Sequence, residues 1–376
     1  MNRFAVFLTV VLGIWSAMHA YVFWRLATIP WVVSFATRRG VIALALLLWL
    51  TYPMGRILQS YHWKISGQFL EFVGAYWVGV LFLLFSAFLV VDLVTGGGFL
   101  LPKYAIKARA GGAVLAGLLA IMAILQGLRP PVVRDYEVVL PNLPRERDGL
   151  ILVQISDLHL GTMTGKGRLE DIIRRVQGLN PDMVVVVGDL VDSNVEAAQS
   201  FIPVLQHLRA PLGVWAVTGN HEYYAGLERS IELFRKAGFS VLQDDIAEPV
   251  PGLSLAGVDD LTSRGEYGAK DGVVSRVLAR RRPGATILLS HSPLEVAEAA
   301  KAGAGLMLSG HTHNGQIWPF NYLVRLRYQF IGGPYKAGPM RLLVCRGTGT
   351  WGPRMRLWYP SEMLRIKLRS PEAVQH

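Results

Sequence analysis

The chain has 376 residues, which is enough for more than one domain and a sizeable core. Hydrophobic residues make up 52% of it, more than an ordinary soluble enzyme carries, and the net charge is +11. Residues 1–135 hold 11 of the 38 Lys and Arg residues but three of the 27 acids. The positive charge therefore marks membrane flanks rather than a nucleic-acid-binding surface, and we expect no nucleic-acid partner. The single cysteine, Cys345, excludes a disulfide framework and a cysteine-based zinc site within one chain.

The N-terminal third contains four long apolar stretches. They lie near residues 4–24, 41–58, 70–94 and 112–128, and Pro53 interrupts the second. A helix needs about 20 apolar residues to cross the hydrocarbon core of a bilayer. We therefore predict a transmembrane region over residues 1–130 with about four helices, and a multi-pass location in the cell membrane. The basic residues are shared almost equally between the two sides of such a bundle, so they do not orient it.

A different pattern begins after this region. Residues 131–148 form a linker rich in prolines and charges, within which Tyr136–Leu140 is predicted to be a first strand. From residue 149 to about 370, short β-rich runs alternate with amphipathic stretches. Strands are predicted over 150–155, 183–187, 214–217, 253–256, 286–289, 305–308 and 340–344, and helices over 167–178, 195–208, 226–237, 272–281 and 293–302. This alternation predicts an α/β domain.

Polar residues cluster where the predicted strands end. In open α/β sheets, sites form outside the carboxyl ends of the strands. The blocks DLH, GDLVD, GNHE, SHSP and GHTH supply Asp157, His159, Asp189, Asp192, Asn220, His221, His291, His311 and His313. In the last block the two histidines stand one residue apart, and strand-like alternation would point both to the same side. Each would then face one metal of a pair.

These residue types fit a dinuclear metal centre without thiolates. Imidazole suits zinc, iron and manganese, whereas carboxylate and amide oxygens favour harder cations. We therefore expect two divalent metal ions, of Mn, Fe or Zn. Two metals about 3.5–4 Å apart clamp the attacking and leaving oxygens of a phosphoryl displacement and lower the pKa of a bound water.

The five blocks, in this order, resemble the calcineurin-like metallophosphoesterase family, and the closing segment resembles its membrane-linked bacterial branch. The resemblance covers roughly residues 136–370 and implies a fold of two packed β-sheets flanked by helices. It implies a first metal held by Asp157, His159, Asp189 and His313, and a second held by Asp189, Asn220, His291 and His311. It further implies that metal-bound hydroxide attacks phosphorus, that His221 protonates the leaving oxygen, and that Asp192 orients His221 through a hydrogen bond.

Some positions depart from the family pattern or extend it. Ser193 stands where the Ser/Thr protein phosphatases of the superfamily have an arginine that grips phosphate, which argues against a protein phosphatase. Asn314 stands where many relatives have glycine. In the closing segment, Arg346, Arg354 and Arg356 either contact a phosphate or anionic headgroup or are surface charges near the membrane.

The sequence thus predicts a membrane-anchored metal-dependent phosphoesterase. Its location favours a phosphorylated substrate that is a lipid or lipid-linked, cleaved at a phosphodiester or pyrophosphate bond. The alternative is a broad phosphodiesterase or phosphatase of nucleotides or envelope metabolites. A non-enzymatic membrane scaffold is disfavoured by the intact ligand set and by the scarcity of charges in the apolar stretches. Resemblance to lipid-precursor enzymes alone favours a cytoplasmic catalytic domain, and the oligomeric state stays open.

Overall fold

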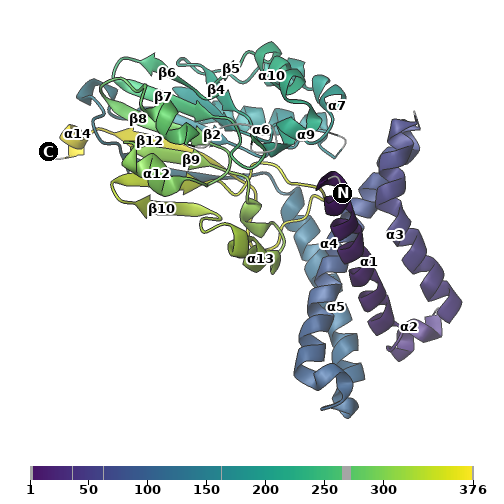
Figure 1. Ribbon diagram of the computed structural model, residues 1–376. Coiled ribbons are helices and arrows are strands. Elements are labelled where there is room, and N and C mark those ends of the chain that lie inside the picture. The colour runs from purple at the N-terminus through teal and green to yellow at the C-terminus, as the bar shows by residue number, and fades with distance from the viewer. Residues whose placement is uncertain (1–2, 36, 62, 162, 265–271, 375–376) are drawn as a thin grey trace. The chain divides into compact units, whose positions relative to one another are not determined.

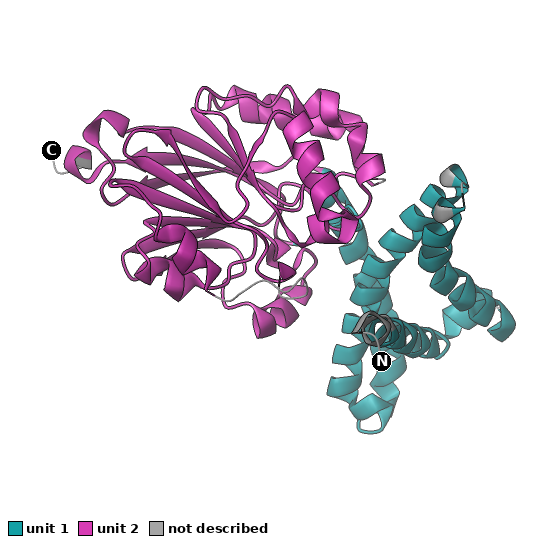
Figure 2. Ribbon diagram, turned by 45° about the horizontal axis from the view of Figure 1, so that its top comes forward, with its two compact units in different colours: residues 1–128, 352–357 teal, residues 129–351, 358–376 magenta. Residues whose placement is uncertain are grey.

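The computed structural model describes residues 3–35, 37–61, 63–161, 163–264 and 272–374. The chain forms two compact units, coloured separately in Figure 2. The helical unit consists of residues 1–128 together with 352–357. The α/β unit consists of residues 129–351 and 358–376. Each unit is described by itself.

The helical unit is built from α1 (Arg3–Leu26), α2 (Pro30–Phe35), α3 (Arg38–Ser60), α4 (Lys64–Thr95) and α5 (Pro102–Leu128) (Figure 1). Among the described residues, α3, α4 and α5 are long and apolar enough to cross a membrane. The sequence predicts about four spans. The stretch near 4–24 forms α1, which is not one of these three. Pro53 does not end the second stretch, because α3 continues through it.

Buried acids in the helical unit are paired. Asp92 on α4 contacts Arg25 at 2.5 Å and Arg109 at 2.9 Å. The Tyr21 hydroxyl donates a hydrogen bond to the same carboxylate at 2.6 Å. Glu71 is also buried and contacts Arg56 at 3.1 Å. An unpaired charge among apolar helices is expensive, so these contacts explain how the bundle accommodates its two acids.

The short segment Gly352–Leu357 packs against α5. The backbone N–H of Arg356 donates to the carbonyl of Ala123 at 2.8 Å, and the Arg356 side chain is fully buried. Arg356 is therefore not a surface charge, because the segment lies within the helical unit. Arg346 lies outside this segment, and it contacts Glu362 at 3.3 Å.

The α/β unit contains two mixed six-stranded sheets. The first has the order β1 (Val132–Val139), β12 (Glu362–Arg369), β2 (Ile151–Ile155), β3 (Met183–Val187), β4 (Val214–Val217) and β5 (Ser240–Val241). The second has the order β10 (Gly333–Ala337), β11 (Met340–Val344), β9 (Leu306–Ser309), β8 (Ala285–Ser290), β7 (Leu253–Val258) and β6 (Asp245–Val250). Strands β2, β3 and β4 are parallel, and so are β7, β8 and β9.

The two sheets pack face to face, and helices cover their outer faces (Figure 1). Side chains alternate along each strand: Val184 and Val186 of β3 face the helices, whereas Val185 and Val187 face the other sheet. The helices of this unit are α6 (Lys166–Gly178), α7 (Val195–Gln199), α8 (Ile202–Leu205), α9 (Asn220–Ala225), α10 (Leu227–Lys236), α11 (Val273–Leu278), α12 (Val296–Lys301), α13 (Phe320–Arg327) and α14 (Pro371–Val374). This architecture confirms the predicted fold of two sheets flanked by helices.

Candidate metal centre

The candidate residues lie at the carboxyl ends of the central strands of both sheets. Asp157 follows β2, Asp189 follows β3, and Asn220 follows β4. On the second sheet, His291 follows β8 and His311 follows β9. Because the strands within each group are parallel and neighbouring, their carboxyl ends share one edge. The two packed sheets bring these edges, and the polar side chains on them, to one place.

The backbone at these residues is strained. Asp157, His159, Asp189, His311 and His313 all have positive φ angles, between 47° and 71°. Non-glycine residues adopt this left-handed conformation at a cost of about 1–3 kcal/mol each. Five of the seven candidate ligands thus have this conformation, just beyond the strand ends.

One cluster contains Asp157, His159 and His313, all buried. The Nε2 atoms of the two histidines lie 3.0 Å apart. Nε2 of His313 lies 3.5 Å from Oδ1 of Asp157. The three side chains therefore offer two imidazole nitrogens and one carboxylate oxygen to the same small volume.

A second cluster contains Asp189, His291 and His311, with Asn220 beside them. Nε2 of His291 lies 3.1 Å from Oδ2 of Asp189 and 3.3 Å from Nδ1 of His311. The same Nδ1 lies 2.8 Å from the amide oxygen of Asn220. On its other side, His291 donates through Nδ1 to the carbonyl of Val187 at 2.8 Å, which leaves Nε2 as the atom that faces the cluster.

Asp189 lies between the two clusters. Its Oδ2 atom is 3.1 Å from His291 and 3.8 Å from Nε2 of His159. Its Oδ1 atom accepts a hydrogen bond from the backbone N–H of His221 at 2.9 Å. One carboxylate thus contacts a histidine of each group and is held in place by the chain itself.

His311 and His313 do not lie on a strand, contrary to the alternation expected from the sequence. The strand β9 ends at Ser309, and both histidines follow it with positive φ angles of 71° and 47°. They nevertheless face different clusters, because the turn separates their side chains. His311 contacts His291, whereas His313 contacts His159.

Asp192 and His221 lie beside the first cluster. Oδ1 of Asp192 is 3.4 Å from Nδ1 of His159 and 3.5 Å from Nδ1 of His221. The hydrogen bond of His221 goes to the backbone carbonyl of Asp192, to which Nδ1–H donates. Asp192 therefore contacts His221 through both its main chain and its carboxylate, and it contacts His159 as well.

Burial and mutual charge shift the pKa values of these groups in the metal-free chain. Burial opposes the charged forms of both Asp189 and His291, but the attraction between the two groups is stronger. The pKa of the Asp189 carboxyl is therefore well below its ordinary value, and the pKa of the His291 imidazole is well above its ordinary value. Burial and the positive His291 lower the pKa of His311 to about 4. Burial raises the pKa of Asp157, although His291 opposes the shift. His311 is therefore neutral near pH 7, the form in which imidazole binds metals.

Two supporting residues were not anticipated by sequence reasoning. Glu222 is fully buried, and its carboxylate accepts hydrogen bonds from the backbone N–H groups of Asp189 (2.9 Å), Val191 (3.0 Å) and Gly219 (2.6 Å). Burial and the nearby Asp189 charge raise its pKa to about 7. The spacing of Gly219 and Glu222 in GNHE is that of a capping box, which is the available signal.

Tyr328 is the other supporting residue. Its hydroxyl lies 2.6 Å from Nε2 of His311. Because Nδ1 of His311 faces the cluster, Nε2–H donates to the tyrosine oxygen. This contact fixes the orientation of the imidazole ring, as partners behind metal-binding histidines generally do. Tyr328 stands alone in a loop sequence, so nothing in the sequence signals this role.

The two departures from the family pattern have local explanations. The Ser193 hydroxyl donates to Oδ2 of Asp192 at 3.2 Å, so this position supports an aspartate rather than presenting a cation. Asn314 is buried in the left-handed conformation with φ 51°. Asparagine tolerates this region better than other non-glycine residues, which makes it suitable at this position.

The donor set fits two divalent metal ions. Imidazole nitrogens that meet at 3.0 and 3.3 Å, interleaved with buried carboxylates, are poorly accommodated without a cation between them. Glycine permits this crowding: a Cβ at Gly219 would lie 2.2 Å from Oδ1 of Asp189.

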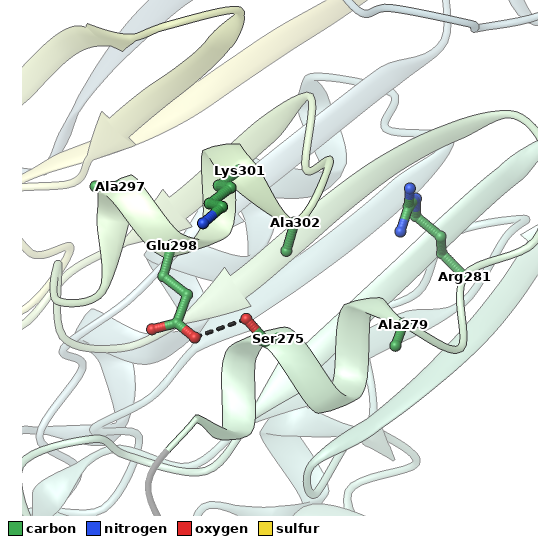
Figure 3. A pocket seen from close by; sticks show the side chains of 7 residues that line it. All are labelled: Ser275, Ala279, Arg281, Ala297, Glu298, Lys301 and Ala302. Atoms are coloured by element: carbon green, nitrogen blue, oxygen red, sulfur yellow. Dashed lines mark hydrogen bonds between the residues drawn. The ribbon is translucent and has the colours of Figure 1, made fainter.

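A surface hollow of about 580 Å³ between α11 and α12, in which Ser275 donates to Glu298, contains none of the candidate residues (Figure 3).

The chain is similar to known proteins over this region. A family model described as calcineurin-like phosphoesterase matches residues 151–315. An uncharacterized metallophosphoesterase of Campylobacter jejuni is 35% identical over 263 residues, which cover 68% of each chain. A transmembrane protein with metallophosphoesterase domain from Danio rerio is 35% identical over 268 residues, 68% of this chain and 61% of that protein. The crystal structure of TT1561 of Thermus thermophilus is 14% identical with a TM-score of 0.37, covering 53% of this chain and 90% of that chain.

Two packed sheets with His/Asp clusters at their shared edge define a metal-dependent phosphoric ester hydrolase. The chain belongs to the calcineurin-like phosphoesterase family. That family uses a dinuclear divalent metal centre, and the clusters of this chain can supply one. The three apolar helices and the transmembrane relative indicate a membrane protein.

Proposed function

We propose that the chain is a membrane-anchored phosphoesterase that uses two divalent metal ions to hydrolyse a phosphodiester or pyrophosphate bond in a lipid or lipid-linked substrate. The position of Asp189 carries this proposal, because its Oδ2 atom lies 3.1 Å from Nε2 of His291 and 3.8 Å from Nε2 of His159 in the other cluster. A carboxylate in this position suits a bridge between two cations. We assign the first site to Asp157, His159, Asp189 and His313, and the second to Asp189, Asn220, His291 and His311.

The chemistry divides between the metals and the chain. Two bound divalent ions, as Mn, Fe or Zn, supply Lewis acidity and a water of lowered pKa. The chain contributes the positions of the ligands: Val187 orients His291, and Tyr328 orients His311. Glu222 accepts a hydrogen bond from the backbone N–H of Asp189, and this bond holds the turn that carries Asp189. These contacts keep the proposed metal-ligand atoms in place before the substrate arrives.

His221 is proposed to protonate the leaving oxygen. Its Nδ1–H donates to the carbonyl of Asp192, so Nε2 lies on the opposite side of the ring. The Asp192 carboxylate is 3.5 Å from Nδ1 of the same ring. A positioned acid of this kind contributes typically 10²–10⁴-fold to the rate.

The lipid substrate rests on location. Three apolar helices tie the chain to a bilayer, where a lipid ester is at high local concentration. A broad phosphodiesterase or phosphatase of nucleotides or envelope metabolites is the competing proposal, in which the helices only localise the enzyme. Comparing kcat/KM for a pyrophosphate-linked lipid in mixed micelles with that for soluble nucleotide diesters separates the two. Cleavage of soluble diesters alone would overturn the lipid assignment.

The first test is hydrolysis of bis-p-nitrophenyl phosphate by the detergent-solubilised chain with Mn²⁺, Zn²⁺ or Fe²⁺. Asp189→Asn is expected to lose both metal binding and turnover. His221→Ala is expected to keep its metal while turnover falls about 10²–10⁴-fold. Asp171→Asn, on the exposed face of α6, is the matched control and keeps both. Full activity of Asp189→Asn would refute the dinuclear mechanism.

A further inference from the structure

Helix α13 turns its apolar side chains outward. Its one buried residue is the polar Asn321. Tyr322, Leu323 and Leu326 are exposed by 59%, 53% and 84%. At helical spacing these three positions share one side of the helix, opposite Asn321. A helix that packs on a protein core has the reverse arrangement.

Basic residues flank this apolar side. Arg325 and Arg327 are exposed, and the helical turn puts them on its two borders. Within the described residues neither arginine forms an ion pair, and Arg327 lies over the ring of Tyr328. An outward apolar stripe between two cations is the pattern of a helix that lies on an anionic bilayer surface.

The same helix is fastened to the metal centre at both ends. Tyr328, its C-terminal cap, contacts His311 at 2.6 Å. The first turn of α13 passes so close to the His313–Gly315 turn that a Cβ at Gly315 would lie 2.3 Å from the backbone nitrogen of Asn321. The exposed apolar side therefore belongs to an element whose position is set by the two histidines of GHTH.

An exposed tryptophan is hydrogen-bonded to the segment that precedes α13. Trp351 is 55% exposed, and its backbone exchanges two hydrogen bonds of 2.9 Å with the side chain of Gln316. The residues that follow it in the chain, Gly352–Leu357, belong to the helical unit. Tryptophan is enriched at the interface between bilayer and water, so its place at this junction agrees with a lipid neighbour.

We propose that α13 is a membrane-contact helix whose Tyr322, Leu323 and Leu326 enter the bilayer interface while Arg325 and Arg327 bind lipid phosphate. This inference rests on the membrane location of the chain and not on the phosphoesterase reaction. Its consequence is that the metal centre opens next to the lipid surface, where the ester of a lipid can reach it.

The test uses the full-length chain in nanodiscs that hold one copy. Cys345 is fully buried, so a cysteine introduced by Leu326→Cys can be labelled selectively with an environment-sensitive fluorophore. Arg235→Cys, on the exposed face of α10, is the matched control. With anionic lipids we expect blue-shifted emission at 326, quenching by nitroxide-labelled lipid and protection from iodide, and the opposite at 235.

Each other outcome overturns the inference. Water-like emission at 326 means that nothing covers α13. Protection from iodide without quenching by lipid nitroxide means that protein covers it, either the helical unit or a second copy. Equal quenching at 326 and 235 means that the bilayer contact is not specific to α13. Hydrolysis of the soluble diester in the same nanodiscs reports on the proposed function separately.

A second variant tests the role of the charges. Replacing both arginines by glutamine is expected to shift the docking equilibrium of α13 by roughly 30-fold, at about 1 kcal/mol per basic residue near an anionic surface. The same loss should follow from zwitterionic lipid without any substitution. An unchanged docking equilibrium in both experiments would refute the proposed binding of lipid phosphate.

Discussion

The substitution Gly219→Ala tests the packing around the central carboxylate. Gly219 has an ordinary extended conformation, with φ −108°, which alanine adopts readily. The effect is therefore steric: the new Cβ would lie 2.2 Å from Oδ1 and 2.9 Å from Cγ of Asp189. The new Cβ would also lie 2.6 Å from the backbone nitrogen of Asp189. Non-bonded carbon atoms approach to about 3.5–4.0 Å, so the carboxylate and the main chain that carries it must move by about 1 Å.

That displacement has a predictable size in two measurements. Overpacking lowers the free energy of unfolding by about 1–3 kcal/mol, or roughly 2–12 °C in Tm for a domain of this size. Metal affinity is expected to fall about 10–100-fold, as when a partner of a ligand is lost. A displacement of about 1 Å at a reacting centre is also enough for a 10²-fold loss of turnover.

Calorimetric metal titration and thermal unfolding of the detergent-solubilised chain provide the assay. Gly165→Ala is the matched control, because Gly165 has φ −78° and a Cβ there would meet nothing within 4 Å. Its Tm and metal affinity should stay close to those of the unmodified protein. If Gly219→Ala also binds two metals with unchanged affinity, Asp189 does not hold them and the assignment of the bridge is wrong.

Further predictions concern stability. Glu222→Ala leaves three buried backbone N–H groups unpaired, at about 1–3 kcal/mol each, so the Tm should fall by more than that of any surface variant. Phe234→Ala removes a fully buried ring and should cost about 3–5 kcal/mol in urea unfolding with metal sites intact. Asp92→Ala leaves Arg25 and Arg109 without their carboxylate. It should destabilise the helical unit by about 3–5 kcal/mol, seen as earlier aggregation in detergent. Removing metal with a chelator should lower the Tm, and Mn²⁺ at 100 times its Kd should restore about 2.7 kcal/mol; a Tm indifferent to metal contradicts binding at these clusters.

The core of the α/β unit could be predicted because its strands are continuous apolar runs. Met183–Val187, Val214–Val217 and Met340–Val344 have the same bounds in the sequence reading and in the structure. β12 was missed although Glu362–Arg369 alternates apolar residues with charges, which is the pattern of a half-buried strand. Its Arg365 and Arg369 are paired by Asp135 and Glu137 of β1, about 230 residues earlier, and no local pattern reports such pairing.

The site shows the same division between local and distant information. The GHTH and GNHE blocks predict metal ligands because their residue types and spacing are those of metal-binding sites. Tyr328 could not be found this way, since only the fold brings its hydroxyl to His311. The turn after β9 was also beyond sequence reasoning, because alternation is a property of strands and the strand had ended. Likewise, an apolar helix such as α13 does not reveal from its sequence that its apolar side faces outward.

The position of β12 has a consequence for how the protein is made. β1 follows the last apolar helix directly in the chain, but its hydrogen-bonding neighbour in the sheet is β12. The two strands are parallel, with Val132 opposite Glu362 and Val139 opposite Arg369. At about 5–20 residues per second, a ribosome needs roughly 10–50 seconds to synthesise the intervening chain. During that interval β1 has no partner strand, and chaperones, proteases or a wrong strand can bind to its free backbone groups. β12 lies between β1 and β2 in the sheet. A chain that is terminated before β12 is synthesised therefore lacks the strand that joins β1 to the rest of the sheet. Complete assembly of the first sheet thus requires complete translation.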